Sequence, residues 1–272
     1  MDYRHIARKA IKQAKYELDS GEEHRLVYAS LELRMALEAL TYERASLYSS
    51  ELSGKKLSTW QPRILLNILL EIDPYVDKSA NISFGKQEEY GKPAKKMTSL
   101  GKERVLSLKE IKEYYDRLGS YLHTPTIEQL AEGKGSSPEK IRIRCGEIYN
   151  IIDEVLSSPI FNFNLKKTST ITCDKCANKI VRRIPPDSES LIAKCINCSA
   201  SYTLKVDRKQ DIWIPNYQTI ECFNPSCNST FRFWENEIEL GAKWSCKECK
   251  GINQIVYGVE FTEAVNNNDT KG

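Results

Sequence analysis

Eight of the nine cysteines in this sequence lie between residues 173 and 249, grouped in four close pairs. The pairs are Cys173/Cys176, Cys195/Cys198, Cys222/Cys227 and Cys246/Cys249. In each half of this region, 18 residues separate the first pair from the second (177–194 and 228–245). Cysteines separated by two to four intervening residues can bind the same ion, and a second pair completes a tetrahedral site. The spacing therefore predicts two Zn²⁺ ions, each bound by four cysteines.

A disulfide framework is the alternative explanation of these cysteines. It fits poorly, because residues 1–5 lack the apolar core of a signal peptide and a reducing compartment keeps thiols free. We expect a cytoplasmic protein without membrane contact, since the longest apolar run, residues 64–70, is too short to cross a bilayer. Four sulfur ligands leave no open position on either zinc, so both ions are expected to be structural. The ninth cysteine, Cys145, is expected to be a buried core thiol.

The elements that position these cysteines follow from a change of periodicity near residue 160. Helical spacing predicts helices over about 2–19, 22–51, 62–73, 107–123 and 138–156, with a long insertion at about 74–106 that includes a hairpin near Ile82. Strand patterns begin at Phe161. We therefore predict an α+β multidomain protein. Its parts are an all-α helical bundle (1–160), two small β zinc ribbons (166–210 and 216–262) and a disordered tail (263–272).

Two segments of the helical half combine residue types that are suited to chemistry. Arg34 and Glu38 are four residues apart, so they share one face of the second helix. Arg117 and His123, with five residues between them, stand at the end of the fourth helix. A purely structural role is the alternative: Arg34, Glu38 and Arg117 would form a buried ion network, and His123 would cap the helix dipole.

The Arg117–His123 spacing resembles the Arg-x(4–6)-His motif of the HEPN superfamily, helical-bundle proteins that include many metal-independent ribonucleases. The Arg34/Glu38 helix is similar to the Arg-x-x-x-Glu helix of HEPN-related bacterial proteins, and the resemblance covers roughly residues 1–157. It implies an endoribonuclease in which Arg117 holds the scissile phosphate, His123 acts as general acid or base, and Glu38 orients Arg117. It also implies a homodimer with a composite cleft, as in toxins or phage-defence effectors.

The charge of the chain bears on its partners. The formal net charge is +3, but two Zn²⁺–tetrathiolate sites at −2 each bring it to about −1 (3 − 4), so strong non-specific DNA binding is not implied. Residues 166–215 nevertheless hold ten Lys/Arg against five Asp/Glu. The candidate phosphate contacts in the first ribbon are Lys166, Lys167, Lys179, Arg182 and Arg183. A merely solvated basic face is the alternative.

The second ribbon contains several aromatic residues: Phe223, Phe231, Phe233, Trp234 and Trp244. Exposed rings beside Arg232 could stack on unpaired RNA bases, whereas buried rings would form the core around the zinc. Contact of this acidic ribbon with a protein partner is equally open. For the whole chain, the alternative to RNA cleavage is a non-catalytic dimeric regulator or scaffold that binds nucleic acid or protein.

Overall fold

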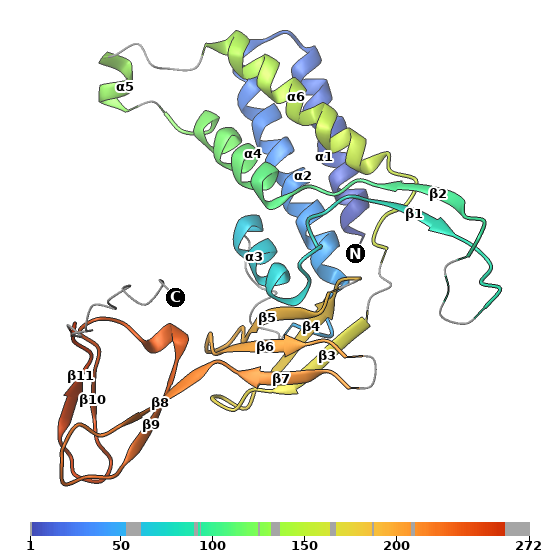
Figure 1. Cartoon of the computed structure of the whole chain (residues 1–272). Coiled ribbons are helices and arrows are strands. Elements are labelled where there is room, and N and C mark those ends of the chain that lie inside the picture. The colour runs from blue at the N-terminus through green and yellow to red at the C-terminus, as the bar shows by residue number, and fades with distance from the viewer. Residues whose placement is uncertain are drawn as a thin grey trace, which may run out of the picture. The chain divides into compact units, whose positions relative to one another are not determined.

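The computed structural model describes residues 2–52, 61–89, 92, 94–124, 126–131, 137–163, 167–186, 188–207 and 210–258. The chain divides into two units. The helical unit consists of Met1–Thr170 and Val181–Ser188, and the ribbon unit consists of Ile171–Ile180 and Glu189–Gly272. Helices dominate the first and short antiparallel strands the second (Figure 1), which confirms the predicted α+β class.

The helical unit is built around one central helix. Its helices are α1 (Tyr3–Asp19), α2 (Leu26–Ser46), α3 (Pro62–Ile72), α4 (Leu108–Tyr121), α5 (Ile127–Ala131) and α6 (Pro138–Leu156). Helix α2 contacts α1, α3, α4 and α6. The buried residues of α2 include the small Ala29 and Ala36 as well as Leu33 and Leu37. The two alanine side chains let the four neighbouring helices approach closely. Within the described residues, no helix has the length and apolar character needed to cross a membrane.

Local hydrogen bonds begin these helices where the sequence predicts. Ser107 and Glu110 form a capping box at the start of α4, and Ser137 caps α6 with Pro138 in its first turn. Asp2 caps α1 by accepting hydrogen bonds from the backbone N–H groups of Arg4 and His5. Cys145 of α6 is fully buried, with its thiol 3.4 Å from the Ser30 hydroxyl, which confirms the core role predicted for it.

The insertion contains the predicted hairpin, formed by antiparallel strands β1 (Ala80–Phe84) and β2 (Thr98–Glu103). Its base is tied to the bundle by a buried ion pair, in which the Arg44 guanidinium lies 2.9 Å from the Glu103 carboxylate. A second buried ion pair joins Arg4 of α1 to Glu43 of α2 at 3.1 Å. Both pairs satisfy charges that would be costly to bury alone.

Within the described residues, the remaining strands form four small sheets. The strands are β3 (Lys167–Thr172), β4 (Lys179–Ile184), β5 (Ser190–Lys194), β6 (Ser201–Lys205), β7 (Ile212–Pro215), β8 (Tyr217–Glu221), β9 (Thr230–Trp234), β10 (Lys243–Ser245) and β11 (Ile252–Gln254). They pair as β3–β4, β5–β6–β7, β8–β9 and β10–β11. The first ribbon thus comprises β3–β7 and the second ribbon comprises β8–β11.

The two ribbons share one hydrophobic core inside the ribbon unit. Tyr202 of β6 is fully buried, and its ring centroid lies 5.1 Å from that of Trp234 in β9. Tyr217 of β8 packs edge-on against the same tryptophan. The Ser201 hydroxyl also donates to the Glu235 carboxylate at 2.9 Å. The second ribbon therefore contributes side chains to the core beneath the first, although the sequence predicts two separate modules.

Candidate metal centres and surface residues

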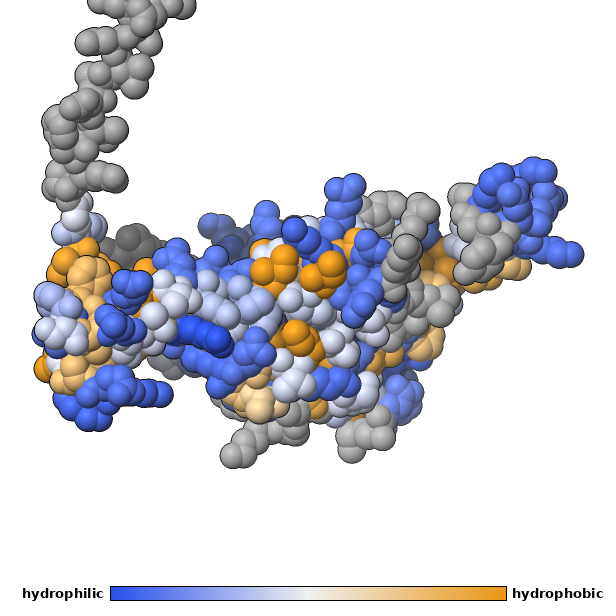
Figure 2. Space-filling view, turned by 60° about the horizontal axis from the view of Figure 1, so that its bottom comes forward, coloured by the Kyte–Doolittle hydropathy of each residue, from blue (hydrophilic) through white to orange (hydrophobic). Residues whose placement is uncertain are grey.

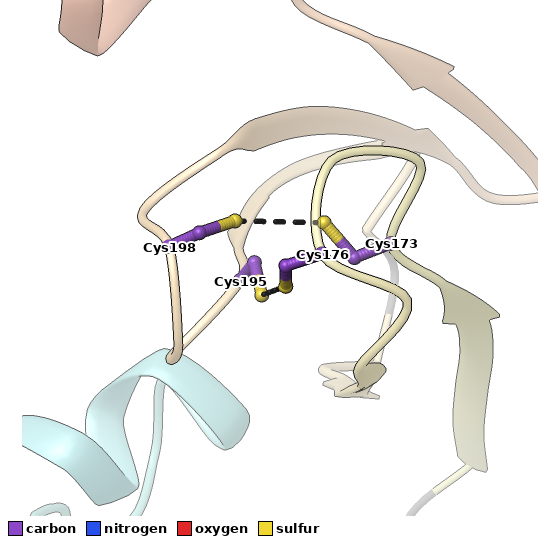
Figure 3. Close-up of side chains that lie close together, drawn as sticks. All are labelled: Cys173, Cys176, Cys195 and Cys198. Carbon is purple, nitrogen blue, oxygen red and sulfur yellow. Dashed lines mark hydrogen bonds between the residues drawn. The ribbon is translucent and has the colours of Figure 1, made fainter.

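The four cysteines of the first cluster converge from two knuckles (Figure 3). The sulfur of Cys173 lies 3.6 Å from that of Cys198, and the sulfur of Cys176 lies 3.5 Å from that of Cys195. All four sulfurs are within 4.8 Å of one another. Zn–S bonds of about 2.3 Å in a tetrahedron place sulfurs about 3.8 Å apart, whereas a disulfide bond needs about 2.05 Å. The spacing fits a shared ion.

The second cluster has the same geometry. The sulfurs of Cys222 and Cys249 are 3.7 Å apart, as are those of Cys227 and Cys246. These four sulfurs also lie within 4.8 Å of one another. In both clusters the first cysteine of each pair is buried and the second is half-buried. The two predicted four-cysteine sites are therefore present, and both are consistent with structural zinc ions.

Backbone hydrogen bonds fold each two-residue knuckle. In the first knuckle, the N–H of Cys173 donates to the carbonyl of Asn178 and the N–H of Ala177 donates to the carbonyl of Cys173, both at 2.8 Å. This turn requires a left-handed residue directly after the second cysteine. Ala177, Ser199 and Lys250 occupy that position with φ values of 58°, 61° and 62°. A non-glycine residue is strained there, and the backbone hydrogen bonds of the knuckle hold the turn in place.

A hydrogen-bonding side chain supports each cluster from an equivalent position, four residues after its last cysteine. The Tyr202 hydroxyl accepts from the Asp174 N–H at 2.8 Å and donates to the Cys173 sulfur at 3.6 Å. The Asn253 carboxamide accepts from the Phe223 N–H at 2.9 Å and donates to the Cys222 sulfur at 3.7 Å. Both side chains are buried. Donors of this kind orient a ligand and stabilise its thiolate charge.

Each cluster combines thiols of low and high proton affinity. Burial raises the pKa of Cys176, but hydrogen bonds from Asn178, Asn197 and Cys195 outweigh it and lower that pKa to about 6. Backbone hydrogen bonds, first that of Cys249, lower the pKa of Cys246 to about 6 as well. Burial and neighbouring thiols instead raise the pKa of Cys198 to about 12. Four thiolates cannot coexist this closely without a cation, which is the charge that Zn²⁺ supplies.

Arg117 and His123 are both exposed at the end of α4. The Arg117 guanidinium interacts with Tyr121, one helical turn later. His123 follows Leu122, the residue that ends the helix. Within the described residues, no hydrogen bond or ion pair joins Arg117 to His123. The arrangement leaves both side chains accessible from solvent, without linking them within one chain.

Glu38 contacts a different partner from the one predicted. Its carboxylate accepts a hydrogen bond of 2.7 Å from the Tyr115 hydroxyl, and the Arg34 guanidinium stacks on the Tyr115 ring at 3.9 Å from its centroid. Gly119 makes room for this stacking, because a Cβ there would lie 2.9 Å from Arg34 Nη1. Glu38 therefore ties α2 to α4 instead of orienting Arg117. Sequence reasoning missed Tyr115, although a glycine inside α4 was a sign of close helix contact.

Two of the five predicted phosphate contacts in the first ribbon need correction. Arg182 is buried and donates to the carbonyls of Leu70 and Glu71 at 2.7 and 2.6 Å. Arg183 is also buried and pairs with Glu51 at 2.8 Å. Both guanidiniums belong to the interior of the helical unit, so they are not available to a phosphate.

The other predicted nucleic-acid contacts are on the surface or outside the described residues. Lys167 and Lys179 are exposed, and Lys166 lies outside the described part of the chain. Arg232 is exposed and lies over the Tyr217 ring, 5.1 Å from its centroid.

The five aromatic residues of the second ribbon divide by exposure. Trp234 is buried in the shared core. Phe231 and Phe233 are half-buried and pack edge-on against Trp244. Phe223 alone among the five is mostly exposed. Most of these rings therefore serve packing, as one of the two sequence interpretations expects.

Comparison with known proteins assigns no family. No protein-family model matches the chain, and neither a curated protein nor a solved structure matches it significantly. The HEPN resemblance therefore rests on the motif residues alone. The class defined by the fold and the site is an α+β protein with a helical N-terminal unit and two tetracysteine metal clusters.

Proposed function

We propose that this protein binds RNA and cleaves it without a catalytic metal, and that the ribbon unit recognises the RNA or a protein partner. The observation that supports cleavage is the exposure of Arg117 and His123 together at the end of α4. In the described part of the chain, neither side chain forms an ion pair with a carboxylate. Both are thus available for a phosphate and a ribose hydroxyl.

The chemistry needs only these two residue types. The 2′-hydroxyl of RNA attacks the adjacent phosphorus, the 5′-oxygen leaves, and one proton moves from the first oxygen to the second. An imidazole can both accept and donate a proton, so His123 is suited to transfer it. Arginine offers a planar set of donors, so Arg117 is suited to hold the phosphate oxygens as negative charge grows. A homodimer would bring two such pairs to one RNA strand.

The test is cleavage of total RNA by the purified full-length chain in EDTA, with zinc content measured after incubation. We expect Arg117→Ala and His123→Ala to abolish cleavage while both variants remain folded. His24→Ala is the matched control. His24 is also exposed, but it lies in the turn before α2 and pairs with Glu22. Equal cleavage by wild type and the two α4 variants would refute the catalytic role.

A non-catalytic regulator or scaffold is the second candidate, and the Glu38–Tyr115 hydrogen bond favours it. That bond gives Glu38 a structural role between α2 and α4, where catalysis would have Glu38 orient Arg117. A protein of this kind binds RNA or protein through the ribbon unit and dimerises through the helices. This candidate would be supported over the first if neither wild type nor any variant cleaves RNA and if His123→Ala binds RNA as well as wild type does.

A further inference from the structure

The second ribbon exposes four large apolar side chains, three of which (Phe223, Ile252 and Val256) line a groove. Phe223, Ile252, Val256 and Tyr257 are 81%, 75%, 70% and 86% exposed. The groove lies between residues 220–224 and the segment 251–256, and Trp244 also lines it. Figure 2 shows hydrophobic side chains gathered over β10 and β11, at the left end of the view.

Apart from the metal ligand Cys222, the residues that line the groove have no side chain that is charged at neutral pH. The lining residues are Ile220, Cys222, Phe223, Asn224, Trp244, Gly251, Ile252, Asn253, Gln254, Ile255 and Val256. None of them carries a carboxylate, amine, guanidinium or imidazole, in a chain where 28% of residues are charged. A nucleic-acid backbone would find no counter-charge here, and phosphate contacts supply much of nucleic-acid affinity. The groove instead matches an apolar, uncharged partner.

Strand β11 presents an unpaired edge next to this groove. The Cys246 N–H donates to the Gly251 carbonyl at 2.8 Å, and the Ile255 N–H donates to the Ala242 carbonyl at 2.9 Å. The backbone N–H and C=O groups of the odd-numbered residues in 251–255 therefore point toward β10. Antiparallel alternation then turns the backbone groups of Ile252 and Gln254 away from β10. Within the described residues β11 pairs with β10 alone. Such an edge can accept another strand.

Trp244 adds a buried polar group to the groove lining. Its indole Nε1 is buried and has no hydrogen-bond partner among the described residues. The ring is held by edge-on packing against Phe231 and Phe233, with centroids 5.8 and 4.6 Å away. A buried donor without an acceptor is costly, and a carbonyl oxygen from a bound chain would remove that cost.

We propose that this groove binds an extended, uncharged apolar segment of a partner protein, which adds as a strand along the open edge of β11. Its backbone pairs with Ile252 and Gln254, alternate side chains enter the groove, and one carbonyl accepts from the Trp244 indole. This peptide site is independent of RNA cleavage by the helical unit.

The test begins with phage-displayed octapeptides of Val, Ile, Phe, Thr, Ser, Asn and Gln, selected on the zinc-loaded full-length chain. An enriched peptide is then synthesised with and without N-methyl groups on alternate residues, and its affinity is measured by fluorescence anisotropy. We expect Ile252→Glu to weaken binding at least about tenfold and Trp244→Phe to weaken it about threefold. Ile192→Glu is the matched control, because Ile192 of β5 is exposed outside the groove.

N-methylation of the residues that pair with β11 should abolish binding to the wild-type chain, a result that needs no protein variant to fold. The proposal is overturned if no peptide is enriched, if the N-methylated peptide binds equally well, or if Ile192→Glu weakens binding as much as Ile252→Glu. Displacement of the peptide by a single-stranded RNA 12-mer, with loss of RNA binding in Ile252→Glu, would also overturn it.

Discussion

The hydroxyl of Tyr202 and the carboxamide of Asn253 offer a way to weaken one metal centre at a time. Tyr202→Phe keeps the buried ring and removes the group that bonds to Cys173 and to the Asp174 N–H. Asn253→Ala removes the corresponding bonds to Cys222 and to the Phe223 N–H. We expect each substitution to lower the zinc affinity of its own cluster and to leave the other cluster nearly unchanged.

The magnitude follows from the bonds that are lost. A hydrogen bond to a charged group contributes about 1.5–3 kcal/mol, and loss of a donor to a metal ligand typically lowers metal affinity about 10–100-fold. The two figures agree, because tenfold corresponds to about 1.4 kcal/mol. Asp174 and Phe223 are exposed, so water can replace the lost acceptor at their N–H groups. The expected effect is therefore near the lower end, about 10–30-fold at one site.

Zinc retained per chain is measured by native mass spectrometry along a series of chelators of increasing affinity. Wild type should keep two ions up to a given chelator strength. Each variant should pass through a one-zinc species at a weaker chelator, with the unaltered ribbon as its internal control. If Tyr202→Phe and Asn253→Ala both keep two ions as tightly as wild type, these two side chains do not stabilise the thiolates.

Two further predictions concern stability. Burial opposes ionisation of Glu110, but hydrogen bonds from Arg104 and Ser107 outweigh burial and lower the pKa of its carboxyl. The unfolded chain therefore binds more protons than the folded chain near this pKa, and the free energy of unfolding falls as pH drops below about 5. Urea unfolding of Glu110→Gln should show a shallower pH dependence, and an unchanged slope would contradict this. Ala177→Gly should raise stability by about 0.5–1 kcal/mol by relieving its left-handed strain. Thermal unfolding in excess zinc measures this gain in stability. Ala193→Gly is the control, because Ala193 lies in the extended strand β5, where glycine should lower stability.

The parts of the fold that could be predicted depend on residues close in sequence. The two clusters follow from cysteine spacing, because the two ligands of a knuckle are at most five positions apart. The start of α4 follows from Ser107 and Glu110, and that of α6 from Ser137 and Pro138. Each pair and each cap is complete within about one turn of chain, and only 18 residues separate the two pairs of a cluster, so no knowledge of distant contacts is needed.

The features that could not be predicted depend on contacts far apart in the chain. Arg182 belongs to a basic run, and nothing local indicates that its guanidinium meets carbonyls more than 100 positions earlier. The equivalence of Tyr202 and Asn253 was hidden because a phenol and a carboxamide share little except the ability to accept and donate. Glu38 was similarly misassigned, since its partner Tyr115 is on another helix.

Eight cysteines are expected to form two zinc–thiolate centres that hold the ribbon unit together. The most direct measurement is elemental analysis of the purified full-length chain, combined with thiol counting before and after zinc removal. We expect two zinc ions per chain and eight thiols that become reactive only when the metal is removed. A zinc content near zero, with cysteines oxidised to disulfides, would contradict it.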